Sequence, residues 1–333
     1  SSSCSSDSSS DSFYGSSPHQ VFTSFFISPI RCSEYVLKST GPTRSMLLFS
    51  PSTTSPSRKR SSEVLGSGGF GSVVISSYNK RAVALKKVPS TGCRQQRLLS
   101  SELLAFLVPA SPYVVSALGF SVVDNAFHVV SELIDGGNLQ SLIDDEEYVM
   151  DCELKMDAIH QICLALAHCH ASAILHLDVK PANVLFVKAT RSFKLADFGC
   201  SIIGKHRTTI EDGRVVEMVE CTDPSRIHGG TIAYQAPEIF KKAGVTCRSD
   251  VYSLAMCAWH ILTGTAPFFG HHPHFIVYTV VSNHARPDID RIVSPFTPLR
   301  PLLRSLWSSD ALARPSTQEL LQQLAAIPIG DDV

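Results

Sequence analysis

The spacing of apolar and polar residues differs between two parts of the chain. Between residues 63 and 133 the apolar residues come in short runs rich in Val and Ile, separated by Gly, Asn and Lys, which is typical of antiparallel strands joined by tight turns. One longer segment has apolar residues at helical spacing and is followed by Pro109 and Pro112, which predicts a helix over 95–108. Strands are predicted at 63–65, 71–76, 81–88, 114–122 and 126–133.

Beyond residue 133 the spacing of apolar residues becomes helical. Four of them between 159 and 166 recur at i, i+3, i+4 and i+7, which predicts a helix that ends near residue 170. The segment 249–262 is apolar on almost every side and predicts a buried helix, whereas 193–196 predicts a strand. The order of elements predicts an α+β, bilobal fold, with a small antiparallel β-rich N-lobe carrying one key helix (61–133) and a larger α-helical C-lobe (134–328).

The N-terminal segment has neither the strand-like runs nor the helical spacing of apolar residues. Residues 1–57 contain 20 serines, so the segment buries too little apolar surface to offset the entropy of ordering it. We therefore expect a disordered tail over 1–60, and a short C-terminal tail over 329–333. A phosphoregulated docking segment is the alternative, because four Ser-Pro pairs and the apolar string VFTSFFISPI lie within it.

Composition and charge exclude several partners. With 29 Lys and Arg against 30 Asp and Glu, the formal net charge of -1 argues against nucleic acid. The longest apolar stretch, 251–263, is interrupted and falls short of the roughly 20 residues that span a bilayer, so we expect no membrane contact. The ten cysteines form no CxxC pair, which favours reduced thiols and a cytoplasmic location. Oligomeric state is not indicated.

The first candidate functional motif along the chain is a glycine-rich string. A β-branched strand follows it rather than a helix, so the string predicts a hairpin lid over phosphates and not a dinucleotide-binding turn. Backbone N–H groups that carry no side chain approach anionic oxygens closely. The string consists of Gly66, Ser67, Gly68, Gly69, Phe70 and Gly71.

A lysine follows in an apolar strand, in the string Val-Ala-Leu-Lys that ends at Lys86. A buried ammonium requires an opposite charge, and Glu102 lies on the apolar face of the next predicted helix. An ion pair between them would leave Lys86 aimed at the α- and β-phosphates of a nucleotide. The alternative is a surface lysine that extends from a strand edge.

Two further strings carry acidic and amide side chains. In HLDVKPAN (176–183), Asp178 and Asn183 are five residues apart on a predicted tight loop, where a carboxylate can accept a hydroxyl proton. Asp197 follows the predicted strand 193–196, and Asn183 with Asp197 supplies the hard oxygen ligands that Mg²⁺ prefers. Farther on, Glu238 of Ala-Pro-Glu is expected to pair with Arg314.

Taken in order, these strings resemble the eukaryotic protein kinases, from about residue 62 to 324. The resemblance implies ATP and Mg²⁺, with Asp178 as the catalytic base. Lys180 and Thr231 resemble the serine/threonine-specific version, in which the lysine steadies the γ-phosphate and the threonine contacts the catalytic aspartate. For the nucleotide, the resemblance implies hinge residues Glu132 and Leu133 at adenine, a ribose contact from Asn138, and an apolar sandwich of Val73, Ala84 and Leu185.

Five strings are similar in finer detail to the Mos family of kinases, namely GSGGFGSV, HLDVKPANVL, LADFGCS, GGTIAYQAPE and GVTCRSDVYSL. This resemblance implies a MAP kinase kinase kinase that activates MAP-kinase kinase in oocyte meiotic maturation and arrest. The long segment 197–238 and the serine-rich start depart from that family. The alternatives are another MAP kinase kinase kinase-like enzyme without arginine in its catalytic loop, or a pseudokinase that serves as a scaffold.

Leu177 stands where many kinases have an arginine that binds an activation-loop phosphate. Because leucine cannot bind phosphate in this way, we hypothesise that activity does not require phosphorylation of the loop. The alternative is that Leu177 only fills an apolar gap while another basic residue takes the phosphate.

Overall fold

The computed structural model describes residues 54–55, 64–68, 71–89, 99–123, 126–211 and 214–328. All of them belong to one compact unit that spans residues 36–333. The predicted tails therefore lie outside the described residues, apart from Thr54 and Ser55, which form a two-residue strand on the edge of a sheet.

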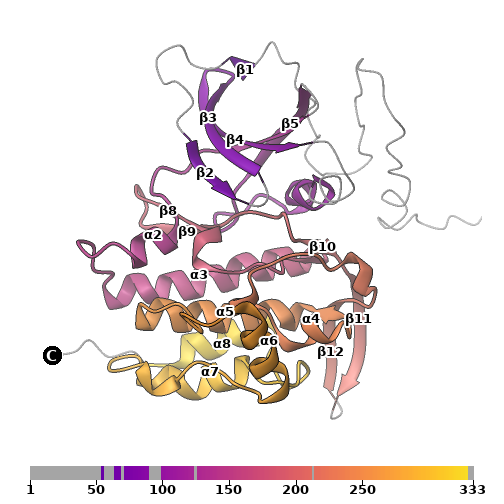
Figure 1. Ribbon diagram of the computed structural model, residues 1–333, viewed down its shortest axis with the longest axis vertical. Coiled ribbons are helices and arrows are strands. Elements are labelled where there is room, and N and C mark those ends of the chain that lie inside the picture. Colours follow the sequence, from indigo (N-terminus) through magenta and orange to yellow (C-terminus); the bar gives the residue numbers. More distant parts are fainter. Residues whose placement is uncertain are drawn as a thin grey trace, which may run out of the picture. The chain divides into compact units, whose positions relative to one another are not determined.

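The N-terminal lobe is a six-stranded antiparallel sheet in the order β1-β3-β4-β6-β5, with β2 paired to β3 (Figure 1). Asn79 and Lys80 join β3 to β4, and both have positive φ, as the tightest two-residue hairpins require. Val74, Val83, Leu85 and Val130 are buried together in this lobe. The strands are β1 (Thr54–Ser55), β2 (Val64–Gly68), β3 (Gly71–Tyr78), β4 (Arg81–Pro89), β5 (Ala117–Val123) and β6 (Ala126–Glu132).

The helix predicted over 95–108 is wrong in type over 103–107, and its first four residues, 95–98, lie outside the described residues. Residues 99–102 are α-helical, but the chain then tightens into the 3₁₀ helix η3 (Leu103–Leu107) and becomes extended at Val108. The following Pro109 disfavours helical backbone at Val108, and 3₁₀ turns are frequent where α-helices end. Residues 114–116, predicted as strand, lie outside β5, and Val114 makes only a single bridge to Leu195.

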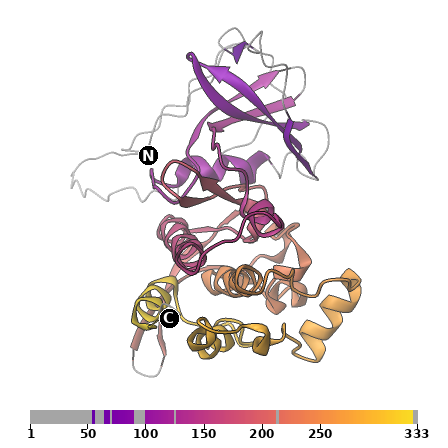
Figure 2. The same ribbon diagram turned by 90° about the vertical axis from the view of Figure 1, so that its left-hand side faces the viewer.

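The C-terminal lobe is built around one buried helix, α5, which contacts α3 and α7 (Figure 2). A capping box at Thr246 begins α5 and Gly264, with positive φ, ends it. Every residue of α5 except its last, Thr263, is buried, as its all-round apolar sequence predicts. The helices are α2 (Leu139–Ile143), α3 (Cys152–Ala171), α4 (Pro237–Lys241), α5 (Cys247–Thr263), α6 (Pro273–Ser282), α7 (Arg300–Leu306) and α8 (Thr317–Ala326).

Short strands in this lobe carry the loops that matter for chemistry. β7 pairs with β10, β8 with β9, and β12 with both β11 and β13, all antiparallel. The α+β prediction, strands first and helices second, is confirmed. Among the described helices, none has the length and apolar character needed to cross a bilayer. The strands are β7 (Ile174–Leu175), β8 (Val184–Val187), β9 (Ser192–Leu195), β10 (Ile202–Ile203), β11 (Lys205–Glu211), β12 (Arg214–Cys221) and β13 (Val245–Thr246).

Candidate active site

Lys86 of β4 lies between two carboxylates that come from distant parts of the chain. Its Nζ donates to Glu102, in the short helix before η3, and to Asp197 Oδ1 at 2.8 Å, just beyond β9. Burial lowers the pKa of Lys86, but the two carboxylates outweigh burial and hold that pKa above its ordinary value. Burial raises the pKa of Glu102 to about 7, against the opposing effect of Lys86. The contact between Lys86 and Glu102 is the one that the sequence predicts.

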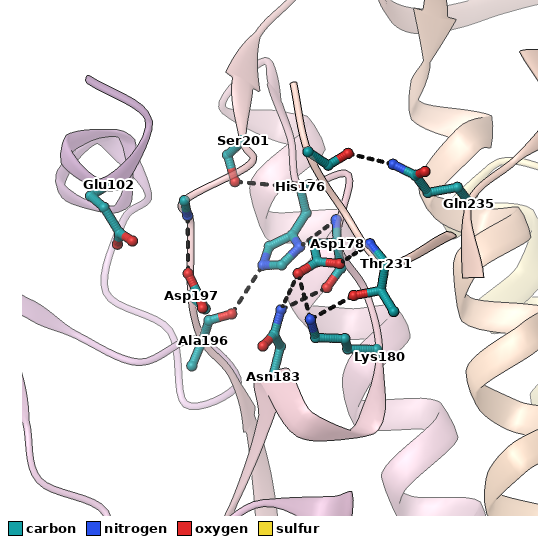
Figure 3. Close-up of polar contacts among 12 residues, drawn as sticks. Glu102, His176, Asp178, Lys180, Asn183, Ala196, Asp197, Ser201, Thr231 and Gln235 are labelled. Carbon is teal, nitrogen blue, oxygen red and sulfur yellow. Dashed lines mark hydrogen bonds and ion pairs between the residues drawn. The ribbon is translucent and has the colours of Figure 1, made fainter. Parts of the chain in front are cut away.

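The loop between β7 and β8 presents Asp178, whose carboxylate is fixed by donors on both oxygens (Figure 3). Thr231 N donates to Oδ1 at 2.8 Å, while Asn183 Nδ2 and Lys180 Nζ each reach Oδ2 at 2.9 Å. Lys180 Nζ also donates to Thr231 Oγ1 at 2.6 Å. Asp178 is buried, so these donors set the orientation of its carboxylate.

Asp250 of α5 holds the loop that carries Asp178 through hydrogen bonds, and the sequence analysis did not predict this role. Its fully buried carboxylate accepts from the backbone N–H groups of His176 (2.9 Å) and Leu177 (2.8 Å), and lies 2.9 Å from His170 Nε2. Burial raises the pKa of Asp250, but the His170 contact and the donors outweigh it, so the pKa lies below its ordinary value. An acidic residue in an otherwise apolar helix was the available signal, because a buried carboxylate needs donors.

The loop is also tied to the segment that carries Asp197. His176 Nε2 lies 3.1 Å from the Ala196 carbonyl oxygen, and Ser201 Oγ donates to the His176 carbonyl at 3.3 Å (Figure 3). Leu177 and Asp197 both have left-handed backbone, with φ of 61° and 62°. Such strain in residues other than glycine persists only where surrounding contacts determine the conformation, and it is frequent at functional sites.

The glycine-rich string forms the β2–β3 hairpin above Lys86. Gly68 pairs with Gly71, and Gly71 has φ of 127° with space for no side chain, because a Cβ there would lie 2.2 Å from the Lys87 carbonyl oxygen. Gly66 and Ser67 lie in the same ladder. The remaining two members of the predicted lid, Gly69 and Phe70, lie outside the described residues.

The three residues predicted to enclose adenine are half-buried and lie on β3, β4 and β8. Val73 pairs in register with Lys86, Ala84 with Ser131, and Leu185 with Lys194. The two strands β3 and β4 therefore place Val73 and Ala84 in the same sheet as Lys86, and β8 belongs to the C-terminal lobe. The three predicted adenine residues therefore come from both lobes.

The predicted hinge and ribose residues have local partners that the sequence did not indicate. Glu132 ends β6, and its carboxylate pairs with Lys194 Nζ at 2.8 Å and accepts from Ser116 N at 2.7 Å. Leu133 follows it and is half-buried. Asn138 caps the N-terminus of α2 by accepting from Ser141 N at 2.9 Å. Lys194, on β9, is therefore a further charged residue beside the hinge.

The expected pair between Glu238 and Arg314 is present. Arg314 Nη1 and Nη2 donate to the two carboxylate oxygens at 2.7 and 2.9 Å, and Ser249 Oγ donates to Oε1 at 2.7 Å. Arg314 is completely buried, and its guanidinium lies 5.0 Å from the Tyr252 ring centroid. Burial raises the pKa of Glu238, but Arg314 outweighs it and holds that pKa below its ordinary value.

Asn183 and Asp197 fit the metal role that the sequence indicates. Asn183 Nδ2 is engaged by the Asp178 carboxylate and by the Asp178 carbonyl at 2.8 Å, which leaves the amide oxygen as the group that can ligate. Asp197 adds a carboxylate whose side chain is 29% exposed. Few protein oxygens suit Mg²⁺, which keeps waters and binds substrate phosphates. No group of three or more His, Cys, Asp or Glu side chains suited to a metal occurs in the described part of the chain.

Comparison with known proteins gives a match to the protein kinase domain over residues 60–324. The chain is 32% identical to the serine/threonine-protein kinase mos of Patiria pectinifera over 266 residues, which are 78% of this chain and 73% of that protein. It is 30% identical to the protein of the same name from Xenopus laevis over 272 residues, 79% and 74% of the two chains. The proto-oncogene serine/threonine-protein kinase mos of Mus musculus is 31% identical over 291 residues, 79% and 78% of the two chains.

Proposed function

Because the chain belongs to the protein kinase family, and within it to the Mos serine/threonine kinases, it is an ATP-dependent serine/threonine protein kinase, and we propose that its substrate is a MAP-kinase kinase. The observation that carries the proposal is similarity to Mos kinases over about four-fifths of the chain, combined with the assembly of Lys86, Glu102, Asp178, Asn183 and Asp197 in one site. In this proposal the enzyme acts as a MAP kinase kinase kinase in oocyte maturation and arrest.

We assign the acceptance of the substrate proton to Asp178. Thr231 and Asn183 fix its two carboxylate oxygens, so one orientation is held before the substrate hydroxyl arrives. Lys180 bridges Asp178 and Thr231, which keeps an ammonium beside the base, and in this proposal that ammonium offsets the negative charge of the γ-phosphate. A positioned base contributes about 10²- to 10⁴-fold to rate.

Lys86 binds the nucleotide phosphates in this proposal, and its pairing with Glu102 keeps the ammonium fixed. The β2–β3 hairpin covers the phosphates and excludes water, while backbone groups at Glu132 and Leu133 face adenine. Val73, Ala84 and Leu185 enclose the ring, and Asn138 reaches the ribose. Asn183 and Asp197 would hold Mg²⁺, which neutralises charge on the β- and γ-phosphate oxygens when bound.

The test is phosphorylation of a catalytically inactive MAP-kinase kinase with MgATP, comparing the unsubstituted enzyme with Asp178→Asn. The matched control is Asp145→Asn, because Asp145 is an exposed aspartate in the loop after α2. We expect transfer to the activation-loop serines, a loss of about 10²-fold or more in Asp178→Asn, and unchanged transfer in Asp145→Asn. Transfer to a generic acceptor but not to MAP-kinase kinase would refute the substrate assignment.

A cytoplasmic location is part of the proposal. It is supported by the seven cysteines among the described residues, all of which are free thiols, as is usual in reducing compartments. Imaging of the tagged full-length chain in oocytes tests this part, and a signal confined to another compartment would contradict it.

A further inference from the structure

The residue immediately before Asp178 is held from two sides. Leu177 is only 3% exposed and has φ of 61°, a conformation that a leucine adopts only under constraint. On one side its N–H donates to Asp250 Oδ1 at 2.8 Å. On the other side its side chain joins a hydrophobic cluster that is separate from the main core of the C-terminal lobe.

This cluster joins the catalytic loop to the segment between Asp197 and Glu238. One part of it belongs to β7, β10 and the loop itself, whereas the other part belongs to β12, β13 and the start of α5. The buried members are Ala173, Leu175, Leu177, Ile202, Met218, Val219, Cys221, Val245 and Cys247.

The segment between Asp197 and Glu238 joins the cluster that contains Leu177 because it folds into a hairpin. β11 pairs with β12 over seven residues, and β12 pairs in turn with β13, so the inner strand is held at both edges (Figure 1). Gly204 permits the close approach, because a Cβ there would lie 2.5 Å from Val219 Cγ1. Its N–H donates to the Ala173 carbonyl at 2.8 Å, which ties the base of the hairpin to the strand before the catalytic loop.

Polar and apolar side chains separate on this hairpin. Lys205, His206, Arg207 and Thr208 of β11 are exposed, and so is Glu217 of β12, whereas the next two residues, Met218 and Val219, are buried. Arg207 pairs with Glu220 on the surface at 3.1 Å. The hairpin therefore joins the cluster that contains Leu177 by apolar burial, and its exposed charges lie outside that cluster.

We propose that the β11–β12 hairpin is a built-in apolar clamp on the catalytic loop, in which Met218 and Val219 are positioning residues that act on Asp178 through Leu177. Burial of their side chains in the cluster that contains Leu177 fixes the strained backbone, and that backbone sets where the Asp178 carboxylate lies. The clamp does the positioning for which many kinases use an arginine bound to a phosphate. The inference rests on the proposed role of Asp178 in phosphoryl transfer.

The test compares Met218→Ala with Glu217→Ala, its exposed neighbour on the same strand, in the full-length chain. We expect kcat to fall about tenfold or more in Met218→Ala, because small displacements of catalytic groups cost up to about a hundredfold in rate. The KM for ATP and the Kd for MgADP should stay within about twofold of the unsubstituted enzyme, since Lys86 and the β2–β3 hairpin are untouched. Met218→Leu, which restores apolar volume, should recover kcat, and Glu217→Ala should not change it.

Val219→Ala, a smaller truncation in the same cluster, keeps the test decisive where Met218→Ala does not fold. Unchanged kcat in a folded Met218→Ala or Val219→Ala variant would overturn the clamp. A fall in kcat matched by an equal loss of MgADP binding would also overturn it, because that result indicates general destabilisation. Lack of transfer by the unsubstituted enzyme to any acceptor would refute the function itself, and the clamp with it.

Discussion

Replacing Arg314 with methionine removes a completely buried charge of the C-terminal lobe while keeping an unbranched side chain. The substitution deletes both bonds to Glu238, a bond to the Arg248 carbonyl (3.0 Å) and one to the Ser308 carbonyl (2.9 Å). It leaves the Glu238 carboxylate, whose side chain is 13% exposed, with Ser249 as its remaining side-chain donor. Uncompensated charge at this depth is the reason for expecting a large effect.

Breaking a buried pair by removing one partner costs about 3–5 kcal/mol. In a domain of this size class each kcal/mol lowers Tm by about 2–4 °C, so we expect Arg314→Met to lower Tm by about 6–20 °C. Adding Glu238→Leu to Arg314→Met should recover most of the loss, because an apolar replacement of the whole pair leaves no charge unpaired. The consequence for function is indirect, since Glu238 lies in the first turn of α4, seven residues after Thr231.

Differential scanning calorimetry of the two variants measures these changes, with Arg191→Met as the control. Arg191 pairs with Asp151 on the surface, where both side chains are more than half exposed, so its removal should barely alter Tm. A Tm loss in Arg314→Met no larger than that in Arg191→Met would refute the reasoning. A double variant as unstable as the single one would refute the role of the unpaired carboxylate.

The same pair sets a pH dependence. Because the folded-state pKa of Glu238 lies below its ordinary value of 4.5, the stability from this carboxylate is fully present above about pH 4.5. That stability is lost as the pH falls through the lower folded value. The Tm difference between the native protein and Glu238→Gln should therefore be largest near neutral pH and shrink in acid, and a difference independent of pH would contradict the assignment.

Two further predictions concern activity. Since the pKa of Glu102 is raised to about 7, protonation as the pH falls through 7 weakens its hold on Lys86, so kcat/KM for ATP should drop on the acid side. This fall of kcat/KM at acid pH should be absent in Glu102→Gln. A pH dependence of kcat/KM that is identical in both enzymes would contradict the prediction. Replacing Thr208, Thr209, Thr222 and Ser225 together with alanine should leave kcat largely intact, because the cluster that holds Leu177 is apolar. A collapse of transfer in that variant would show that loop phosphorylation is required.

The candidate site residues could be predicted from the sequence because each lies in a short string whose neighbouring residues indicate its role. The strand that continues past Gly71 distinguished a phosphate lid from a dinucleotide turn, and the lysine in an apolar strand required an acidic partner. Contact between Lys86 and Glu102, 16 residues apart, follows from these two facts. The buried helix α5 could be predicted in the same way, because its apolar residues occur on almost every side of the helix.

The pair of Glu238 and Arg314, 76 residues apart, was predicted, but two other long-range contacts were not. Asp250 holds the N–H of Leu177 from 73 residues away, and Lys194 reaches Glu132 across 62 residues. Neither pairing leaves a periodic trace in the sequence, since each depends on how two elements pack. The 3₁₀ turn at Leu103–Leu107 was missed for a related reason, because helical spacing does not distinguish a helix of 3.6 residues per turn from a tighter one over five residues.

The sequence by itself determined the order of the lobes, the candidate catalytic groups and the absence of an arginine before Asp178. Only the tertiary structure decided what stands in place of that arginine. The segment from Asp197 to Glu238 is merely long when read along the chain, and its string around Met218 gives no indication of what it covers. Folding brings Met218 into one hydrophobic cluster with Leu177, 41 positions earlier, because burial of apolar surface depends on distance in space and not in sequence.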